Sequence, residues 1–220
     1  MIIEIDNVEL YFNNKLILNG VYLKVETGKI TGILGSNGCG KSCLLNIVFG
    51  NLRAKYSLVR INNTPILKPL YQTKLISYLP QHHFVPNKIK IKTAFNLFQV
   101  DWDTFVNVFE TFIPFKNLYF NKLSGGERRI IEIYLILKCS GKIALLDEPF
   151  SLVAPLYIER IKALIEGEKQ NKAIIITDHM YRHLISVSDT IYLLKNGSTK
   201  LINDLKELED YKYLSIGTLD

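Results

Sequence analysis

An eight-residue stretch near the start of the chain constrains the fold more than any other part of the sequence. It follows the Walker A pattern G-x-x-x-x-G-K-S, which is typical of a phosphate-binding loop, and it consists of Gly35, Ser36, Asn37, Gly38, Cys39, Gly40, Lys41 and Ser42. The apolar run 30–34 before it predicts a buried strand, and residues 42–49 after it predict a helix. Glycines let backbone N–H groups surround phosphate oxygens, and the N-terminal end of the helix attracts the same charge. We therefore expect a nucleoside triphosphate site in which Lys41 contacts the β- and γ-phosphates and Ser42 ligates Mg²⁺.

Composition limits the classes of protein to which the chain can belong. With 220 residues, of which 48% are hydrophobic, it can bury the core of one domain. No apolar run approaches the ~18–20 residues that span a bilayer, and no leader precedes the first predicted strand, so we expect a soluble, unexported protein. The three cysteines have no paired or metal-binding spacing, which suits a reducing cytosol. The net charge of +6 comes mostly from scattered lysines, which favours solubility over contact with nucleic acid or anionic lipid.

The periodicity of the sequence predicts the order of the remaining elements. Residues 2–5 and 21–25 alternate as antiparallel strands do, a pair of short strands follows at 58–61 and 76–79, and residues 92–137 are helical in period. Strand and helix patterns then alternate, with strands at 143–146, 173–177 and 191–194 and helices at 156–165 and 181–187. This order predicts an α/β protein with a P-loop NTPase core. We expect a mostly parallel sheet with helices on both faces, N-terminal antiparallel β strands and an inserted helical subdomain.

Two adjacent acids, Asp147 and Glu148, follow the apolar strand at 143–146. Ligands of parallel sheets bind at the carboxyl ends of the strands, so both carboxylates should emerge beside the phosphate-binding loop. Asp147 can hold Mg²⁺ opposite Ser42, and Glu148 can act as general base on the attacking water. An apolar strand that ends in two acids is by itself weak evidence for a catalytic site. It becomes strong evidence here because the phosphate-binding loop is present in the same chain.

The residues Ser124, Gly125 and Gly126 are a second candidate phosphate-binding segment. Ser124 has the character of a helix N-cap before the apolar helical pattern of residues 127–137. A structural turn with an N-cap would be the ordinary interpretation of these residues in isolation.

The order of these motifs resembles the nucleotide-binding subunit of an ATP-binding cassette (ABC) transporter. Residues 123–127, Leu-Ser-Gly-Gly-Glu, are similar to the signature sequence of that family and lie between the phosphate-binding loop and the acidic strand. The resemblance covers essentially the whole chain. It implies a single ABC ATPase domain over residues 1–220, with a nucleotide-binding core at about 1–81 and 141–220 and a helical signature subdomain at 82–140.

The resemblance also implies roles for individual residues. Gln81 matches a glutamine that senses Mg²⁺ and the membrane subunit, and His179 matches a histidine that contacts the γ-phosphate. Phe12 lies 29 residues before Lys41, where the family places an aromatic ring on the adenine, and Tyr11 is the alternative after a one-residue shift. The expected ligands are ATP and Mg²⁺, with catalytic Glu148, His179 and Gln81 and metal ligands Ser42, Gln81 and Asp147. The expected nucleotide contacts are Phe12, residues 35–43 including Cys43, Ser124, Gly125 and Gly126.

In this family two ATP molecules are sandwiched between the phosphate-binding loop of one subunit and the signature of another. The resemblance therefore implies a second ATPase subunit, in a homodimer or a heterodimer, and integral membrane subunits that hold the chain at the cytoplasmic face of the membrane. Short motifs are similar to ATPases of lipopolysaccharide export and branched-chain amino-acid uptake. ATPases of chromosome maintenance share the Ser-Gly-Gly sequence but insert a long coiled coil, whereas only 81 residues separate Lys41 from Leu123 here. No nucleic-acid partner is expected.

Two positions depart from the family pattern. Cys43 replaces a Ser or Thr and is a poor hydrogen-bond partner for the α-phosphate. Ala154 stands where the family has an acid that couples the two ATP sites. The loss of this acid puts efficient hydrolysis or coupling in doubt and leaves a second interpretation open, a degenerate or regulatory ATP binder with weak turnover.

Aromatic residues recur at three- and four-residue spacing in the inserted region, which predicts one face of a helix. This face either packs in the core of the helical subdomain or forms part of a groove for a helix of a partner. The residues are Phe98, Trp102, Phe105, Phe109 and Phe112.

Overall fold

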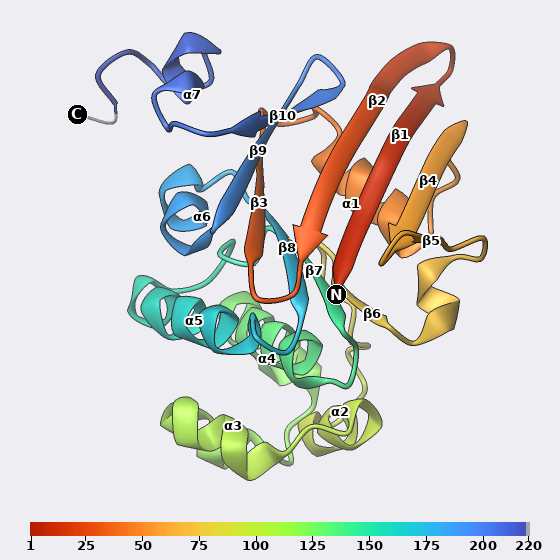
Figure 1. Cartoon of the computed structure of the whole chain (residues 1–220). Coiled ribbons are helices and arrows are strands. Elements are labelled where there is room, and N and C mark those ends of the chain that lie inside the picture. The colour runs from red at the N-terminus through yellow and green to blue at the C-terminus, as the bar shows by residue number, and fades with distance from the viewer. Residues whose placement is uncertain (219–220) are drawn as a thin grey trace.

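Two β-sheets and the helices around them make up the structure (Figure 1). The computed structural model describes residues 1–218. The larger sheet has six strands in the order β10-β9-β3-β8-β7-β6. Strands β9, β3, β8, β7 and β6 are parallel to one another, and β10 pairs antiparallel with β9. The bounds are β3 Ile30–Leu34, β6 Ile76–Leu79, β7 Ile143–Asp147, β8 Ala173–Thr177, β9 Thr190–Lys195 and β10 Ser198–Ile202.

The smaller sheet is antiparallel and has four strands in the order β2-β1-β4-β5. Its strands are β1 Ile2–Phe12, β2 Lys15–Glu26, β4 Tyr56–Ile61 and β5 Thr64–Pro65. The predicted strands at 58–61 and 76–79 both exist but do not pair with each other, because β4 pairs with β1 while β6 pairs with β7. Burial explains this separation. Strand β6 is buried or half-buried throughout, which suits a strand of the larger sheet that is covered on both faces, whereas β4 begins with two exposed residues.

Helices cover both faces of the larger sheet, as the sequence predicts. Helix α1 (Lys41–Phe49) lies between the two sheets, and α4 (Gly125–Lys138), α5 (Pro155–Glu168) and α6 (Tyr181–Val187) lie on the other face (Figure 1). Successive residues of β7 point to opposite faces. Ile143 and Leu145 therefore pack in the core around α1, and Ala144 and Leu146 pack in the core around α4.

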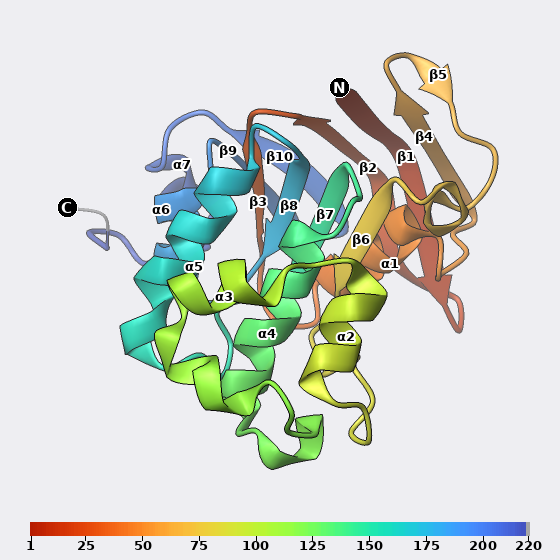
Figure 2. The same cartoon turned by 90° about the horizontal axis from the view of Figure 1, so that it is seen from below.

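The inserted region lies beyond α4, where Figure 2 shows α2 (Ile91–Phe98) and α3 (Trp102–Val108) beside it. Short 3₁₀ helices follow at Glu110–Phe115 and Phe120–Lys122, another lies at Leu70–Thr73, and α7 spans Glu207–Asp210. The prediction of one continuous aromatic helix face is wrong. Helix α2 ends at Gln99, which has a left-handed φ of 56°, and Asp101 starts a new helix by accepting a hydrogen bond from the Thr104 N–H at 2.6 Å.

The aromatic residues nevertheless form a core, which was the first of the two interpretations. Trp102, Phe105, Phe109 and Phe112 are at most 8% exposed. The Phe105 ring lies 4.9 to 5.3 Å from the rings of Phe95, Trp102, Phe109, Phe112 and Tyr134, with tilted and edge-on geometries. These four rings are covered by the chain itself, so they do not line a groove for a partner. The fifth predicted residue, Phe98, is half-buried and packs against the same core. Within residues 1–218, no helix is both long and apolar enough to cross a bilayer.

This aromatic core gives a prediction about stability. Phe105→Ala should lower the free energy of unfolding by about 3–5 kcal/mol, because it removes a fully buried ring among five aromatic neighbours. Leu97→Ala is the control, since Leu97 is 68% exposed and should change the value by no more than about 0.5 kcal/mol. Urea unfolding followed by circular dichroism measures both, and equal effects would contradict the assignment of this core.

Candidate functional site

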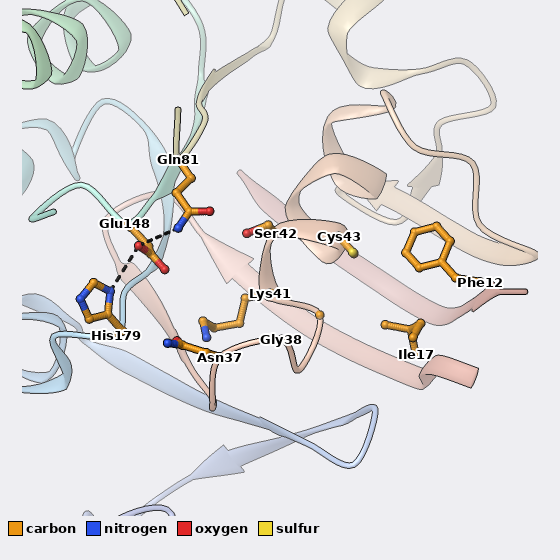
Figure 3. A pocket seen from close by; sticks show the side chains of 11 residues that line it. Phe12, Ile17, Asn37, Gly38, Lys41, Ser42, Cys43, Gln81, Glu148 and His179 are labelled. Atoms are coloured by element: carbon orange, nitrogen blue, oxygen red, sulfur yellow. Dashed lines mark hydrogen bonds and ion pairs between the residues drawn. The ribbon is translucent and has the colours of Figure 1, made fainter. Parts of the chain in front are cut away.

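A pocket of 540 Å³ lies at the carboxyl ends of β3, β7 and β8, a volume typical of small-molecule sites. We call it the phosphate-loop pocket. Figure 3 shows the side chains that line it, and all but Ile17 are among the residues that the sequence predicts. The lining residues are Phe12, Ile17, Asn37, Gly38, Gly40, Lys41, Ser42, Cys43, Gln81, Glu148 and His179.

The loop between β3 and α1 needs glycine at several positions. Gly38 and Gly40 have φ angles of 78° and 108°, which other residues rarely adopt. A Cβ atom on Gly35 would lie 2.6 Å from the Cys39 sulfur and 2.7 Å from the Leu194 carbonyl oxygen, so no side chain fits there. Gly35 and Ser36 do not line the phosphate-loop pocket but an adjoining hollow that also contacts Asn37 and His179.

Lys41 is buried at the start of α1, and its ammonium group donates to the carbonyl oxygens of Gly35 at 2.6 Å and Ser36 at 3.1 Å. These bonds hold the charge inside the curve of the loop. The cap residue Gly40 offers no side chain to the first N–H groups of α1. A cation and unpaired helix N–H groups at one place make a site for an anion.

Asp147 ends β7 with both carboxylate oxygens fixed by neighbouring strands. Thr177 on β8 donates to Oδ1 at 2.5 Å, and Tyr78 on β6 donates to Oδ2 at 3.2 Å. The Tyr78 hydroxyl in turn accepts from Asn46 of α1 at 3.1 Å. Burial first, and then the Asp147 charge, raise the pKa of Tyr78, so the hydroxyl remains a donor at neutral pH. The Asp147 carboxylate is therefore held in one orientation beside the helix that carries Ser42.

Glu148 turns away from Asp147, and its carboxylate meets three polar side chains. Its Oε2 accepts from the Gln81 amide at 3.1 Å and from the Ser151 hydroxyl at 3.2 Å, and the His179 Nδ1 also lies 3.2 Å from it. Figure 3 shows Gln81 and His179 pointing toward this carboxylate from opposite sides. Of the three residues that the sequence assigns to catalysis, Gln81 and His179 thus both contact an oxygen atom of the third, Glu148.

The phosphate-loop pocket has two chemically different ends. Gln81, Glu148 and His179 lie at one end, Phe12 and Ile17 lie at the other, and Lys41 and Ser42 lie between them (Figure 3). Phe12 is 45% exposed, so its ring is open to a ligand, whereas the alternative Tyr11 lies under the Lys55 ammonium at 5.1 Å from the ring centre. Cys43 lies in the wall, and burial raises the pKa of its thiol.

The residues present fit a magnesium ion. Ser42, Gln81 and Asp147 offer a hydroxyl, an amide and a carboxylate oxygen, and Mg²⁺ prefers oxygen ligands while keeping waters and phosphate oxygens in its shell. Gln81 contacts Glu148 through its nitrogen, which leaves its amide oxygen for the ion. Asp147 is buried and does not line the phosphate-loop pocket itself, but each of its oxygens accepts one hydrogen bond and retains a lone pair for an ion or a bridging water.

The signature residues lie elsewhere. Ser124 caps α4 in a capping box, in which its hydroxyl accepts from the Glu127 N–H at 3.3 Å and the Glu127 carboxylate accepts from the Ser124 N–H at 2.7 Å. Gly125 and Gly126 face Leu152, in the loop after Glu148. None of the three lines the phosphate-loop pocket of the described chain.

The sequence motifs do not predict several residues of the site, namely Ile17, Tyr78, Ser151 and Thr177. The signal for two of them was present, because Tyr78 and Thr177 lie in predicted strands next to the strand of Asp147. Ile17 and Ser151 lie at the site through the pairing of β1 with β2 and the turn after Glu148, which no local pattern announces.

Comparison with known proteins identifies many similar chains. The ABC transporter family model matches residues 18–151. An uncharacterized ABC transporter ATP-binding protein of Methanocaldococcus jannaschii is 32% identical, over 90% of this chain and 84% of its own length. The lipopolysaccharide export ATP-binding protein LptB of Escherichia coli is 29% identical, over 87% of this chain and 86% of its own length.

Two further matches concern length and fold. ABC transporter A family member 11 of Dictyostelium discoideum is 28% identical over 94% of this chain, which spans only 26% of that relative's length. The solved structure of an ATP-binding subunit of an ABC transporter superposes with a TM-score of 0.83 at 18% identity, covering 100% of this chain and 97% of the other. This last similarity confirms the predicted fold.

The packing of the signature glycines gives a second stability prediction. A Cβ atom on Gly126 would lie 2.6 Å from the Leu152 carbonyl oxygen, so Gly126→Ala should displace the 151–154 loop and cost about 1–3 kcal/mol of unfolding free energy. Gly125→Ala is the matched control, because its nearest neighbours would lie at 3.7 and 3.9 Å and alanine favours a helix by about 0.5–1 kcal/mol. Thermal unfolding measures both variants, and a lower melting temperature for Gly125→Ala than for Gly126→Ala would contradict this packing.

Proposed function

The chain belongs to the ABC transporter family of ATP-binding proteins, and from this premise we propose that it binds MgATP in the phosphate-loop pocket and hydrolyses it to drive transport by membrane-spanning partners. One observation carries the proposal: Gln81, Glu148 and His179 converge at one end of the same pocket that Lys41 and Ser42 line. An aromatic ring at the far end completes a pocket suited to a nucleotide.

Binding uses the two ends of the pocket differently. The exposed Phe12 ring stacks on the base, a contact that contributes about 1–3 kcal/mol and tolerates different bases. The Lys41 ammonium contacts the β- and γ-phosphates, beside the N–H groups of the loop and of α1. Cys43 supplies no strong hydrogen bond to the α-phosphate, so this part of the site binds through the backbone.

Hydrolysis depends on Glu148. Its carboxylate accepts a proton from the attacking water, and Gln81 and Ser151 hold Oε2 so that the water meets a fixed base. His179 lies at the same carboxylate and donates to the γ-phosphate. The Mg²⁺ held by Ser42, Gln81 and Asp147 would neutralise charge that develops on the phosphates.

The position of the signature supports a dimer. Ser124, Gly125 and Gly126 do not line the pocket of their own chain, so we propose that they contact the γ-phosphate of ATP bound to a second ATPase subunit. ATP then binds two chains together and its hydrolysis releases them. Both a homodimer and a heterodimer satisfy this arrangement.

The membrane partners follow from the family. LptB, a relative, is named as part of a lipopolysaccharide export system, and we propose that this chain is likewise held at the cytoplasmic face by integral subunits. The region 82–140 is the proposed signature subdomain, and residues 1–81 and 141–220 are the proposed core. We propose no nucleic-acid partner, because the 81 residues between Lys41 and Leu123 leave no room for the long coiled coil of chromosome-maintenance ATPases.

A second candidate is an ATP binder with weak turnover, and Ala154 favours it. Ala154 is exposed at the start of α5, where it offers no side-chain cap to the helix. Lys41, Asp147, Glu148 and His179 are all present and oppose this candidate.

Replacement of Glu148 tests the proposed function. Glu148→Gln should reduce phosphate release at least ~10²-fold, because the amide cannot accept the proton, while ATP affinity remains nearly unchanged. The variant should also accumulate as an ATP-bound dimer in size-exclusion chromatography. Glu159→Gln is the control, because Glu159 lies at an exposed position of α5 and its carboxylate forms an ion pair with Lys162. Release at the wild-type rate by Glu148→Gln would refute the role of Glu148.

Replacement of Ala154 separates the two candidates. Position 154 lies in the loop that is proposed to couple neighbouring sites, and an acid there would face the dimer interface rather than the bound phosphates. Ala154→Asp should therefore raise ATP turnover or its Hill coefficient without changing the affinity of the monomer. Asp also caps α5 and should add about 0.5–2 kcal/mol of stability. Ala154→Asn is the matched control, because it caps equally well without the charge. If both variants leave turnover and cooperativity unchanged, the missing acid does not limit the enzyme.

A further inference from the structure

Arg129 is a large, charged and almost completely buried side chain for which the family motifs give no role. It lies on α4, five residues after the cap Ser124, and is 1% exposed. Burial lowers the pKa of its guanidinium, although the nearby carboxylates of Glu132 and Asp147 oppose that shift. A buried guanidinium is costly unless its hydrogen bonds are made, so its partners indicate why it is there.

The partners are backbone carbonyls from two segments of the active site. One terminal nitrogen donates to Pro80, the residue before Gln81, at 2.6 Å. The other donates to Asp147 at 2.5 Å and to Glu148 at 3.0 Å. The planar guanidinium fork therefore joins the signature helix to the backbone that carries Gln81, Asp147 and Glu148.

The geometry at Glu148 makes the double contact informative. In an extended strand the successive carbonyls point in opposite directions. Here two successive carbonyls meet one nitrogen, which is possible because Glu148 has a left-handed φ of 52°. Such a conformation is unfavourable for a residue with a side chain and persists where surrounding contacts hold it.

This turn separates the two acids. Asp147 points toward Tyr78 and Thr177, while Glu148 points toward Gln81, Ser151 and His179. We infer that Arg129 is a positioning residue, which rests on the proposed ATPase function: by holding the carbonyls of Pro80, Asp147 and Glu148 it directs the Glu148 carboxylate and the Gln81 amide into the phosphate-loop pocket. The signature end of α4 and the hydrolytic end of the pocket are thereby tied by one side chain.

The test compares two adjacent arginines. Arg129→Lys keeps the charge but cannot span three carbonyls, so kcat should fall at least 10-fold while KM and the dissociation constant for MgATP change less than 3-fold. Arg128→Lys is the matched control. Arg128 lies on the same helix, but its guanidinium donates to Asn87, Val85 and Glu132 rather than to Asp147 or Glu148, so the kcat of this variant should stay within 3-fold of the wild type.

A double variant distinguishes positioning from a general structural role. If Arg129 acts through Glu148, Arg129→Lys should lower turnover less than 3-fold in a Glu148→Gln background, because that carboxylate is already gone. A further 10-fold loss in that background would overturn the proposal. A wild-type kcat in folded Arg129→Lys protein would also overturn the proposal. The same holds if the loss of kcat is explained by a lower melting temperature, that is, by a smaller fraction of folded protein.

A crystal structure of Arg129→Lys keeps the inference independent of turnover. We expect Glu148 to leave the left-handed region and its carboxylate to lose the contacts with Gln81 and His179. An unchanged Glu148 backbone would overturn the inference even if the enzyme were slow. Absence of ATP hydrolysis by the wild type would instead refute the proposed function, and the crystal structure would still decide whether Arg129 sets the turn.

Discussion

The parallel pairing of β3, β8 and β7 is the constraint on which the site depends. Because parallel strands end at the same edge, the loop after β3, the acids after β7 and the histidine after β8 meet there although they are far apart in sequence. The pairing in turn requires strands that are buried on both faces, and β3, β7 and β8 are buried at every residue. The two hydrophobic cores that cover these faces are therefore also what brings the functional groups together.

Much of the fold could be predicted because its signals are local. The buried strands at 143–146 and 173–177, the helix at 181–187 and the antiparallel start of the chain each follow from a run or an alternation of apolar residues. The inserted region was harder, since three- and four-residue spacing of aromatic residues also arises when short helices share one core. Gln99 in the left-handed region and the Asp101 cap break the helix at residues whose effect the periodicity does not show.

Most residues of the candidate site could also be predicted, but only those that belong to sequence motifs. Lys41, Glu148, Gln81 and His179 belong to motifs of fixed spacing, and the structure brings them to one pocket. Tyr78, Thr177 and Arg129 act through hydrogen bonds across strands and between α4 and β7, so their importance depends on register and helix packing. A motif does not reveal such residues, because their partners lie on other elements; for Tyr78 and Thr177 the predicted strands gave only the position beside Asp147.

The cysteine in the pocket wall has a consequence for how the protein tolerates oxidants. A thiol is attacked by peroxide and by disulfides as the thiolate, and a low pKa makes a cysteine a redox sensor. Burial raises the pKa of Cys43, and the charge of Asp147 raises it further, so at neutral pH the sulfur stays protonated and reacts slowly. The carboxylate at the end of β7 thus favours the neutral form of the neighbouring thiol over the reactive thiolate.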